Sequence, residues 1–160
     1  MTADDAFIDQ KLPAFDLPTD GGGHATNADF AGRILVLYLY PKDDTSGCTK
    51  ESQGFAERHD DFRAAGAEIV GLSKDGVGSH DRFKAKYGLP FTLIADEDTV
   101  LIDALGSWVE KSMYGRSYKG TERSTFIVDG DGVIRKVWRK VKVPGHVDEV
   151  LAAVTAMARD

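Results

Sequence analysis

The run ILVLYLY at residues 34–40 is the longest apolar stretch of the chain, and it constrains the fold more than any other feature. Its length is far below the roughly 20 residues that a helix needs to cross a bilayer. Because neither face of the run carries a polar residue, it is typical of a central strand that is covered on both sides. We therefore expect a fold built around one buried strand, which Pro41 ends.

The rest of the chain predicts strands and helices that alternate around that strand. Phe55 and Phe62 lie on one face of a helix expected over residues 45–65, and Gly66 stands at its terminating position. The pattern further predicts strands over residues 69–73, 91–95 and 124–129 and from residue 133. It also predicts a helix capped by Ser79 and closed by Gly88, and helices over residues 99–105 and 147–157. Residues 107–120 give weaker signals. This order indicates an α/β fold, a mixed central sheet flanked by helices. At about 150 residues per domain, the length fits a single domain over residues 1–160.

The charge balance argues against two classes of partner. With 26 acidic and 20 basic side chains, the net charge of −6 repels phosphate backbones and anionic lipids, so we expect neither nucleic acid nor membrane as a partner. The opening MTADD is acidic and no apolar segment follows it, unlike a secretory signal. The single cysteine, Cys48, forms no disulfide within the chain, which suits the reducing cytoplasm, and we predict that location.

Four other patterns favour plain structure over a ligand site. The DGDG cluster at residues 129–132 lacks the further ligands of a calcium loop and is predicted to be a hairpin turn. The glycine triplet at residues 21–23 opens no helix and predicts a surface turn. The histidines lack zinc-site spacing and are expected at the surface; they are His24, His59, His80 and His146. A run of cations on one strand is expected to form a solvated face; it consists of Arg135, Lys136, Arg139, Lys140 and Lys142.

Cys48 lies in the stretch PKDDTSGCT at residues 41–49, where the central strand gives way to a helix. A place in the first helical turn puts the sulfur beside unpaired N–H groups and the positive end of the helix dipole, which favour a thiolate. This effect is worth about 2 kcal/mol and makes only a mildly reactive cysteine, because nucleophilicity falls as a thiol becomes more acidic. Strong catalysis therefore needs donors to the transition state as well. The plain alternative is a small buried apolar residue.

Two separated motifs resemble those of the peroxiredoxin family. The spacing of Pro41, Thr45 and Cys48 matches the family's active-site signature, and the sequence YPKD at residues 40–43 strengthens the match. The segment RSTFI at residues 123–127 resembles the one that supplies the family's active-site arginine at the start of a late strand. The resemblance is to the bacterioferritin-comigratory, or PrxQ, branch and covers about residues 12–157. It implies a thioredoxin-like fold and a thiol-dependent peroxidase that reduces hydrogen peroxide and organic hydroperoxides.

The resemblance also implies a role for each site residue. The Cys48 thiolate attacks one oxygen of the peroxide, and Arg123 donates guanidinium N–H groups to thiolate and peroxide. Thr45 offers its hydroxyl to the substrate, Pro41 shields the thiolate from water, and neither a cofactor nor a metal is required. Glu51, one turn after Cys48, either orients Arg123 through its carboxylate or faces solvent, and the sequence leaves both open.

Two departures from the branch limit what can be carried over. Ser46 stands where the branch usually has proline, and the chemistry is expected to survive because serine also turns well. Many PrxQ proteins have a second, resolving cysteine, either five residues after the first or in the next helix. In this chain the first of these positions is Gln53 and the second falls in the segment FKA at residues 83–85, so neither is a cysteine. We therefore expect a one-cysteine enzyme that is reduced by an external thiol such as thioredoxin or a glutathione system. The branch suggests a monomer.

A second function stays open from the sequence. A peroxide-sensing interaction protein would pass oxidation from Cys48 to a partner, consuming about one peroxide per cysteine where an enzyme consumes many. A cysteine hydrolase is disfavoured because it needs a histidine base near the nucleophile, and the motif places none of the histidines there. A disulfide reductase of the thioredoxin type needs a Cys-x-x-Cys pair, which this chain lacks.

Overall fold

The computed structural model describes residues 5–159, and most of the opening segment that argues against a secretory signal lies outside this range. The core is a five-stranded sheet in the order β5-β4-β3-β8-β9. Its strands are β3 (Ile34–Leu39), β4 (Ala67–Ser73), β5 (Thr92–Ala95), β8 (Ser124–Val128) and β9 (Ile134–Trp138). β3 pairs parallel with β4 and antiparallel with β8, so the sheet is mixed, as the sequence predicts.

The central place of β3 follows from its apolar side chains. No side chain from Leu35 to Leu39 is more than 1% exposed. Successive residues point to opposite faces, so Leu35, Leu37 and Leu39 join one core cluster while Val36 and Tyr38 join the other. The interpretation of residues 34–40 as a strand covered on both sides is thus confirmed.

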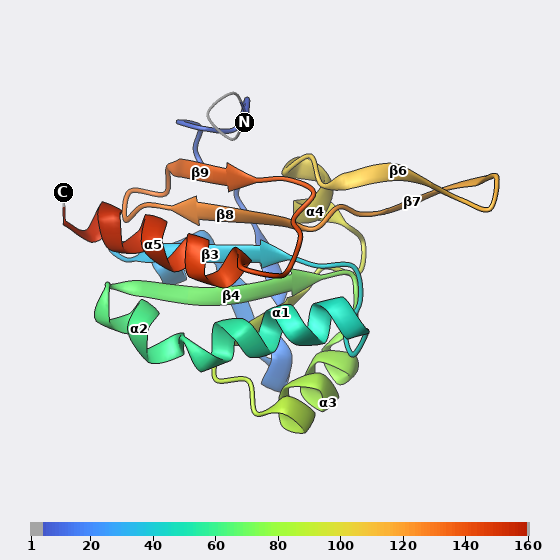
Figure 1. Ribbon diagram of the computed structural model, residues 1–160, viewed down its shortest axis with the longest axis horizontal. Helices are drawn as coiled ribbons and strands as arrows, with labels where there is room; N and C mark the ends of the chain where they lie inside the picture. Colours follow the sequence, from blue (N-terminus) through green and yellow to red (C-terminus); the bar gives the residue numbers. More distant parts are fainter. Residues whose placement is uncertain (1–4, 160) are drawn as a thin grey trace.

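Both faces of the sheet are covered. Figure 1 shows α1 (Ser46–Glu57), α2 (His59–Ala64) and α5 (His146–Ala158) on one face, with α3 (Val77–Tyr87) at the β5 edge. The other face is covered by α4 (Val100–Ala104) together with β1 (Asp16–Pro18), β2 (His24–Thr26) and the short 3₁₀ helix η3 (Asn27–Phe30). A second 3₁₀ helix, η2 (Asp20–Gly22), contacts α3 and β5. Within the described part of the chain, no helix has the length and apolar character needed to span a membrane.

The helix predicted over residues 45–65 is in fact two helices, α1 and α2, which meet at Arg58. The ψ angle of Arg58 is 7°, which interrupts the helix, and Asp60 and Asp61 give the second helix the acidic first turn that helix starts favour. The prediction of one continuous helix was therefore wrong. Phe55 and Phe62 still share one core, with ring centroids 5.8 Å apart.

The helix predicted to be capped by Ser79 begins earlier, at Val77, with Gly76 at the cap position. The Ser79 hydroxyl donates instead to Asp43 at 2.8 Å, across 36 residues of sequence. The capping prediction failed because a distant acceptor competes with the local backbone for the same hydroxyl. The other end is as predicted, since Gly88 closes the helix with a left-handed φ of 63°.

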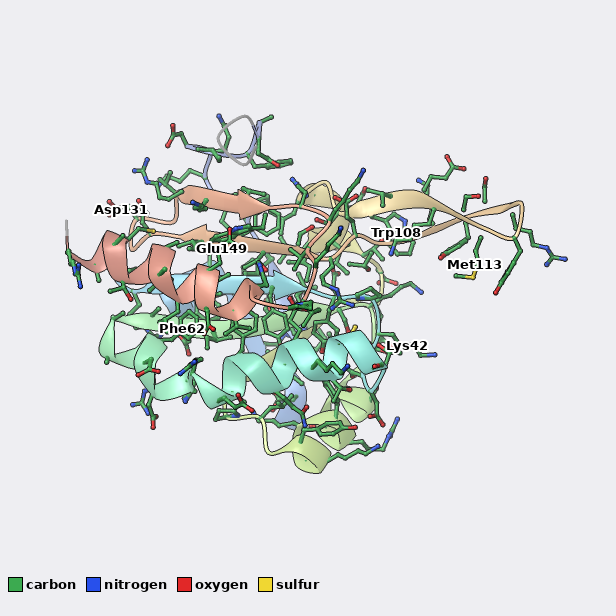
Figure 2. All side chains as sticks on the ribbon, in the orientation of Figure 1. Lys42, Phe62, Trp108, Met113, Asp131 and Glu149 are labelled. Atoms are coloured by element: carbon green, nitrogen blue, oxygen red, sulfur yellow. The ribbon has the colours of Figure 1, made fainter. Side chains whose placement is uncertain are left out.

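Residues 107–120, which give weak sequence signals, contain a hairpin of β6 (Trp108–Met113) and β7 (Arg116–Thr121). Tyr114 and Gly115 at its turn have positive φ angles of 53° and 77°, as a two-residue primed turn requires. The hairpin extends away from the body of the molecule (Figure 1), and Met113 lies near its far end (Figure 2). Most of its side chains are exposed or half-buried, so no alternating pattern marks these strands in the sequence.

Candidate functional site

Strand register brings Arg123 to the end of the strand that precedes Cys48. In the antiparallel pair of β3 and β8, Leu39 lies opposite Ser124. Arg123 directly precedes Ser124, and the β3–α1 loop (residues 40–45) directly follows Leu39. The carbonyl of Arg123 is held by the backbone N–H of Val141 at 3.0 Å. Arg123 and Cys48, which are 75 residues apart in sequence, therefore meet at the end of β3 that leads into this loop.

The buried residues Cys48 and Glu51 and the partly exposed Arg123 form one group, called the cysteine cluster below. Cys48 is 1% exposed and Glu51 is 0% exposed. Arg123 donates through Nη2 to Sγ of Cys48 at 3.4 Å and through Nη1 to Oε1 of Glu51 at 2.8 Å. Of the two orientations that the sequence leaves open for Glu51, the structure has the one that faces Arg123.

Only one of the two carboxylate oxygens of Glu51 has a hydrogen-bond partner within residues 5–159. Its Oε2 atom is buried without a hydrogen-bond partner among the described residues. Burial raises the pKa of Glu51 to about 7, and the charge and hydrogen bond of Arg123 only partly oppose this rise. Near neutral pH this carboxyl is therefore poised between its neutral and ionised forms. The strength of the electrostatic attraction of Arg123 to Glu51, relative to its attraction to Cys48, consequently depends on pH.

Two features of α1 allow the cysteine cluster to form. Gly47 leaves room for Arg123, since a Cβ at this position would lie only 3.1 Å from Nη2. The helix is fixed to β3 by a 2.8 Å hydrogen bond between the Tyr38 hydroxyl and Oγ of Ser52, and the Tyr38 ring stacks on Phe55 with centroids 4.7 Å apart. Cys48 thus has a fixed place in the first turn of α1, where the backbone N–H groups have no intrahelical acceptor.

The other two residues of the sequence signature lie in the β3–α1 loop and are exposed. Thr45 occupies the N-cap position of α1, yet its hydroxyl does not cap the helix and donates to the carbonyl of Lys42 at 2.8 Å. The hydroxyl oxygen keeps lone pairs that can accept a hydrogen bond from a ligand. Pro41 stands at the start of the loop beside Lys42, which Figure 2 labels at the edge of the molecule near α1.

Tyr40, Asp43, Ser79 and His80 form a second group, called the histidine cluster below, which joins the β3–α1 loop to α3. The Asp43 carboxylate accepts from the Tyr40 hydroxyl at 2.6 Å, from the Ser79 hydroxyl at 2.8 Å and from Nδ1 of His80 at 2.7 Å. Nε2 of His80 points at the carbonyl oxygen of Ile94 at 2.8 Å. Because both ring nitrogens face acceptors, both carry hydrogen, and His80 is an imidazolium paired with Asp43.

The histidine cluster corrects the prediction that the histidines lie at the surface. His80 is 0% exposed; burial opposes its charge, but the hydrogen bond and charge of Asp43 outweigh burial and raise the pKa of His80. His146 is 4% exposed, with Nε2 2.8 Å from Oγ1 of Thr125, and burial lowers the pKa of His146 to about 4. The prediction failed for these two because each finds a buried polar partner far away in sequence.

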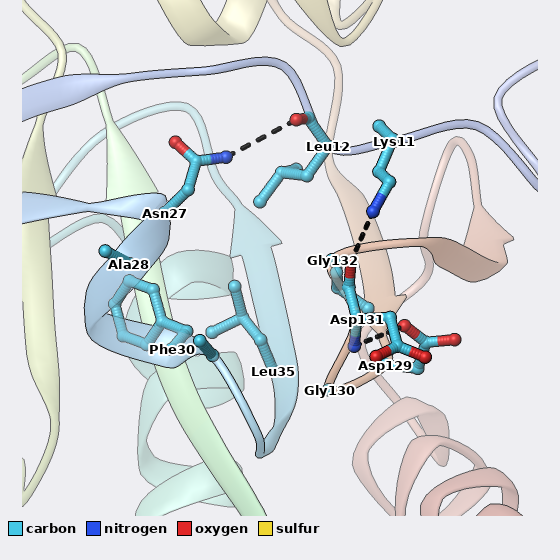
Figure 3. Close-up of a pocket in the computed structure, with 12 residues that line it drawn as sticks. Lys11, Leu12, Asn27, Ala28, Phe30, Leu35, Asp129, Gly130, Asp131 and Gly132 are labelled. Atoms are coloured by element: carbon cyan, nitrogen blue, oxygen red, sulfur yellow. Dashed lines mark hydrogen bonds between the residues drawn. The ribbon is translucent and has the colours of Figure 1, made fainter.

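A cavity of about 280 Å³ lies at the end of the sheet opposite Cys48, where β3 begins (Figure 3). Phe30 and Leu35 line it together with the turn at residues 129–132. In that turn Asp129 accepts from the backbone N–H of Asp131 at 2.9 Å, so the DGDG cluster is the hairpin turn that the sequence predicts. Across residues 5–159, no group of three or more His, Cys, Asp or Glu side chains is placed to hold a metal ion.

The run of cations after residue 134 is largely solvated, as the sequence predicts, since Arg135, Lys140 and Lys142 are exposed; Arg139 is the exception. The Arg139 side chain is only 24% exposed, and it donates to Asp5 at 2.8 Å while its guanidinium lies 5.1 Å from the centre of the Phe126 ring. Arg135 pairs with Asp129 at 2.8 Å. The charges of Arg135 and Arg139 are therefore paired within the fold.

Comparison with known proteins identifies the family. The AhpC/TSA family model matches residues 8–137, a span that contains Pro41, Thr45, Cys48 and Arg123. The chain belongs to the peroxiredoxins of this family. It is 46% identical over 157 residues to peroxiredoxin Bcp of Xanthomonas campestris, covering 97% of this chain and 98% of that protein. It is 42% identical over 151 residues to peroxiredoxin Bcp of Bacillus subtilis, covering 94% and 96%.

Solved structures agree with the family assignment. Peroxiredoxin Q of Xanthomonas campestris superposes with a TM-score of 0.87 at 47% identity, covering 90% of this peroxiredoxin and 91% of that chain. PrxQ of Xylella fastidiosa, solved as a mutant, gives a TM-score of 0.88 at 39% identity, covering 95% and 94%. The resemblance to the bacterioferritin-comigratory or PrxQ branch and the thioredoxin-like fold are therefore confirmed. Like other peroxiredoxins, the chain is a thiol-dependent peroxidase.

Proposed function

We propose that this peroxiredoxin reduces hydrogen peroxide and organic hydroperoxides through Cys48 alone, and that an external thiol returns Cys48 to its reduced form. The observation that carries the proposal is a single cysteine whose buried sulfur lies 3.4 Å from the Arg123 guanidinium. A solved structure of the Xanthomonas relative is described in terms of its alkyl peroxide reduction activity. Serine mutants at two different cysteines are known for that relative, whereas this chain offers only one.

The first step is an in-line displacement on the O–O bond. The Cys48 thiolate bonds to the near oxygen, and the far oxygen leaves with the electron pair, takes up a proton and departs as water or alcohol. The cysteine is thereby oxidised to sulfenic acid and the peroxide is reduced. Negative charge develops on the departing oxygen, and Arg123 and the N–H groups of the first turn of α1 oppose it.

Two residues of the β3–α1 loop complete the proposed site. The Thr45 hydroxyl proton is committed to the Lys42 carbonyl, so its oxygen accepts the O–H of the peroxide and orients the O–O bond toward the sulfur. Pro41 has no N–H to bind water and limits the access of solvent to the thiolate. Glu51 acts through Arg123, holding Nη1 so that Nη2 faces Cys48.

The second step needs a thiol that the chain does not contain. A thiol attacks the sulfenic sulfur and water leaves, which produces a mixed disulfide; a second thiol then releases Cys48 and carries the disulfide away. Thioredoxin or a glutathione system fits this chemistry in the reducing cytoplasm, where we place the enzyme. We further propose that it works as a monomer, as the resemblance to the PrxQ branch suggests.

Intact-mass spectrometry tests the one-cysteine mechanism. One equivalent of peroxide without thiol is expected to add about 16 Da, and a sulfenic-acid trap is expected to label Cys48. Excess peroxide is expected to add about 32 and then 48 Da as sulfinic and sulfonic acids form. A covalent dimer as the main product, or sustained turnover without added thiol, would contradict the mechanism.

Turnover with added thiol tests the function itself. Peroxide consumption is measured on the purified chain with dithiothreitol, thioredoxin and a glutathione system side by side. The expected result is many peroxides consumed per Cys48 with at least one of these reductants. Consumption of about one peroxide per cysteine with all of them would instead favour the peroxide-sensing function.

A further inference from the structure

The β3–α1 loop is held in a strained shape by its contacts with α3. Asp44 has a φ of 60°, in the left-handed region, which is costly for a residue other than glycine and persists only where the surroundings impose it. Asp44 pairs with Lys86 and Tyr87 at 2.8 and 2.6 Å, but these groups are exposed or half-buried and such pairs contribute little. Asp43, the neighbouring residue, makes its contacts inside the protein.

We propose that the Asp43–His80 ion pair is a latch that fixes the β3–α1 loop to α3, and that Asp43, Ser79 and His80 are positioning residues for peroxide reduction at Cys48. The inference rests on Cys48 being the reacting thiol. These residues act through the loop, because Asp43 lies two positions before Thr45, whose carbonyl accepts the first hydrogen bond of α1 from Thr49 at 2.8 Å.

The latch is tied to several elements at once. The backbone N–H of Asp43 donates to Asp75 at 2.8 Å, and Asp75 is held in turn by the hydroxyl of Ser73 at the end of β4 at 2.6 Å. His80 reaches β5 through the carbonyl of Ile94. The side chains of His80 and Asp43 are 0% and 2% exposed. Removing one partner would leave a buried charge unpaired, so the arrangement is either closed or broken, with little in between.

A closed latch and a broken latch have opposite effects on two reactions of Cys48. When the latch is closed, Thr45 and the first turn of α1 are aligned with Arg123, and only small molecules reach the sulfur of Cys48, a residue that is 1% exposed. When it is broken, the loop moves, the donors to the peroxide lose their alignment and the sulfur becomes more accessible. Breaking the latch is therefore expected to slow peroxide reduction and to speed alkylation by a larger reagent.

Two substitutions at His80 separate its two hydrogen bonds. The amide nitrogen of glutamine lies near the place of Nε2 and that of asparagine near the place of Nδ1. His80→Gln thus keeps the donor to Ile94 and loses the donor to Asp43, and His80→Asn does the reverse. We expect His80→Gln to slow single-turnover oxidation of Cys48 by hydrogen peroxide about 10-fold or more and to speed its alkylation by iodoacetamide several-fold. His80→Asn keeps the hydrogen bond to Asp43 but loses the positive charge, so both of its rates are expected to lie between those of wild type and those of His80→Gln.

Ser79→Ala is a milder second variant, in case His80→Gln does not fold. It removes only one of the donors to Asp43, and smaller changes in the same two opposite directions are expected. Lys84→Ala is the matched control, because Lys84 lies on α3 and pairs with Asp20 at 2.8 Å rather than with the loop. It is expected to leave both rates at the wild-type level.

The outcomes distinguish the latch from a purely structural role. Wild-type rates for both reactions in the folded His80→Gln and Ser79→Ala variants would overturn the latch, and so would a parallel fall of both rates. A wild-type chain that consumes no peroxide would contradict the proposed function instead. In that case the alkylation rates still decide whether His80 controls access to Cys48.

Discussion

The cysteine cluster and the histidine cluster lie on two sides of the start of α1, and both bury charged groups, but they differ in how fully those groups are paired. In the histidine cluster, both oxygens of Asp43 and both ring nitrogens of His80 have partners between 2.6 and 2.8 Å. In the cysteine cluster, Arg123 donates to the Cys48 sulfur at 3.4 Å, an ordinary distance for sulfur, but Oε2 of Glu51 has no partner among residues 5–159.

This difference separates a group that holds structure from a group that can react. A buried polar atom without a partner costs about 1–3 kcal/mol, so the cysteine cluster gives up stability that the histidine cluster retains. A guanidinium has five N–H donors, and the contacts to Glu51 and Cys48 use two of those on Arg123, which leaves others for an incoming substrate. Substitutions of Cys48 and Arg123 should therefore change rates more than stability, and those in the histidine cluster should change the position of the loop.

The largest effect is expected for Cys48→Ser, which should abolish peroxide consumption. An alcohol of high pKa supplies no soft anion to attack the O–O bond. The thiol-coupled consumption of hydrogen peroxide measures the loss, and the thermal unfolding midpoint should stay close to that of the wild type because the two side chains are similar in size. Residual activity above about a tenth of wild type would mean that Cys48 is not the nucleophile.

Arg123→Lys is expected to lower kcat/KM about 30- to 1,000-fold, which corresponds to about 2–4 kcal/mol. An ammonium cannot reproduce the guanidinium fork that contacts Glu51 and Cys48 together. Arg58→Lys is a matched control, since Arg58 pairs with the exposed Asp148 outside the cysteine cluster. Equal kcat/KM values for wild type and Arg123→Lys would mean that Arg123 is not the arginine that assists peroxide reduction.

Thr45→Val is expected to reduce the second-order rate with peroxide by about 5- to 30-fold, or about 1–2 kcal/mol. The substitution keeps the shape of the side chain and removes the hydroxyl that bonds Lys42 and is free to accept from the substrate. Thr45→Ser should restore most of the rate. If the valine variant reacts as fast as wild type, Thr45 serves only the local fold of the loop.

Glu51→Gln is expected to have the smallest effect on rate, about 3-fold, and a distinct effect on the pH dependence of stability. The folded state raises the pKa of Glu51 from 4.5 to about 7, so the folded protein holds a proton there that the unfolded chain has released. The free energy of unfolding of wild type relative to the variant should therefore fall as pH rises from about 4.5 to about 7. Denaturant titrations at several pH values measure this difference, and a flat difference would place the Glu51 pKa near its ordinary value.

Much of the fold could be predicted from the sequence because its signals are local. The apolar run that forms β3, the glycine that closes α3 and the turn between β8 and β9 each depend on residues that are neighbours in the chain. The hairpin at residues 108–121 escaped prediction because its exposed strands bury no repeating face. The position of Cys48 in the first turn of a helix was also readable locally, because Pro41 ends a strand and the residues from Thr45 onward favour a helix.

What the sequence by itself determined is the elements, the family motifs and the single cysteine that limits the redox chemistry. The tertiary structure alone decided which distant groups meet: Glu51 with Arg123 across 72 residues, and Asp43 with His80 across 37. The physical reason is that the free energy of a buried charge depends on its partners and on its distance from water. Both are set by the register of β3 with β8 and by the packing of α3 against the β3–α1 loop, neither of which local residue patterns encode.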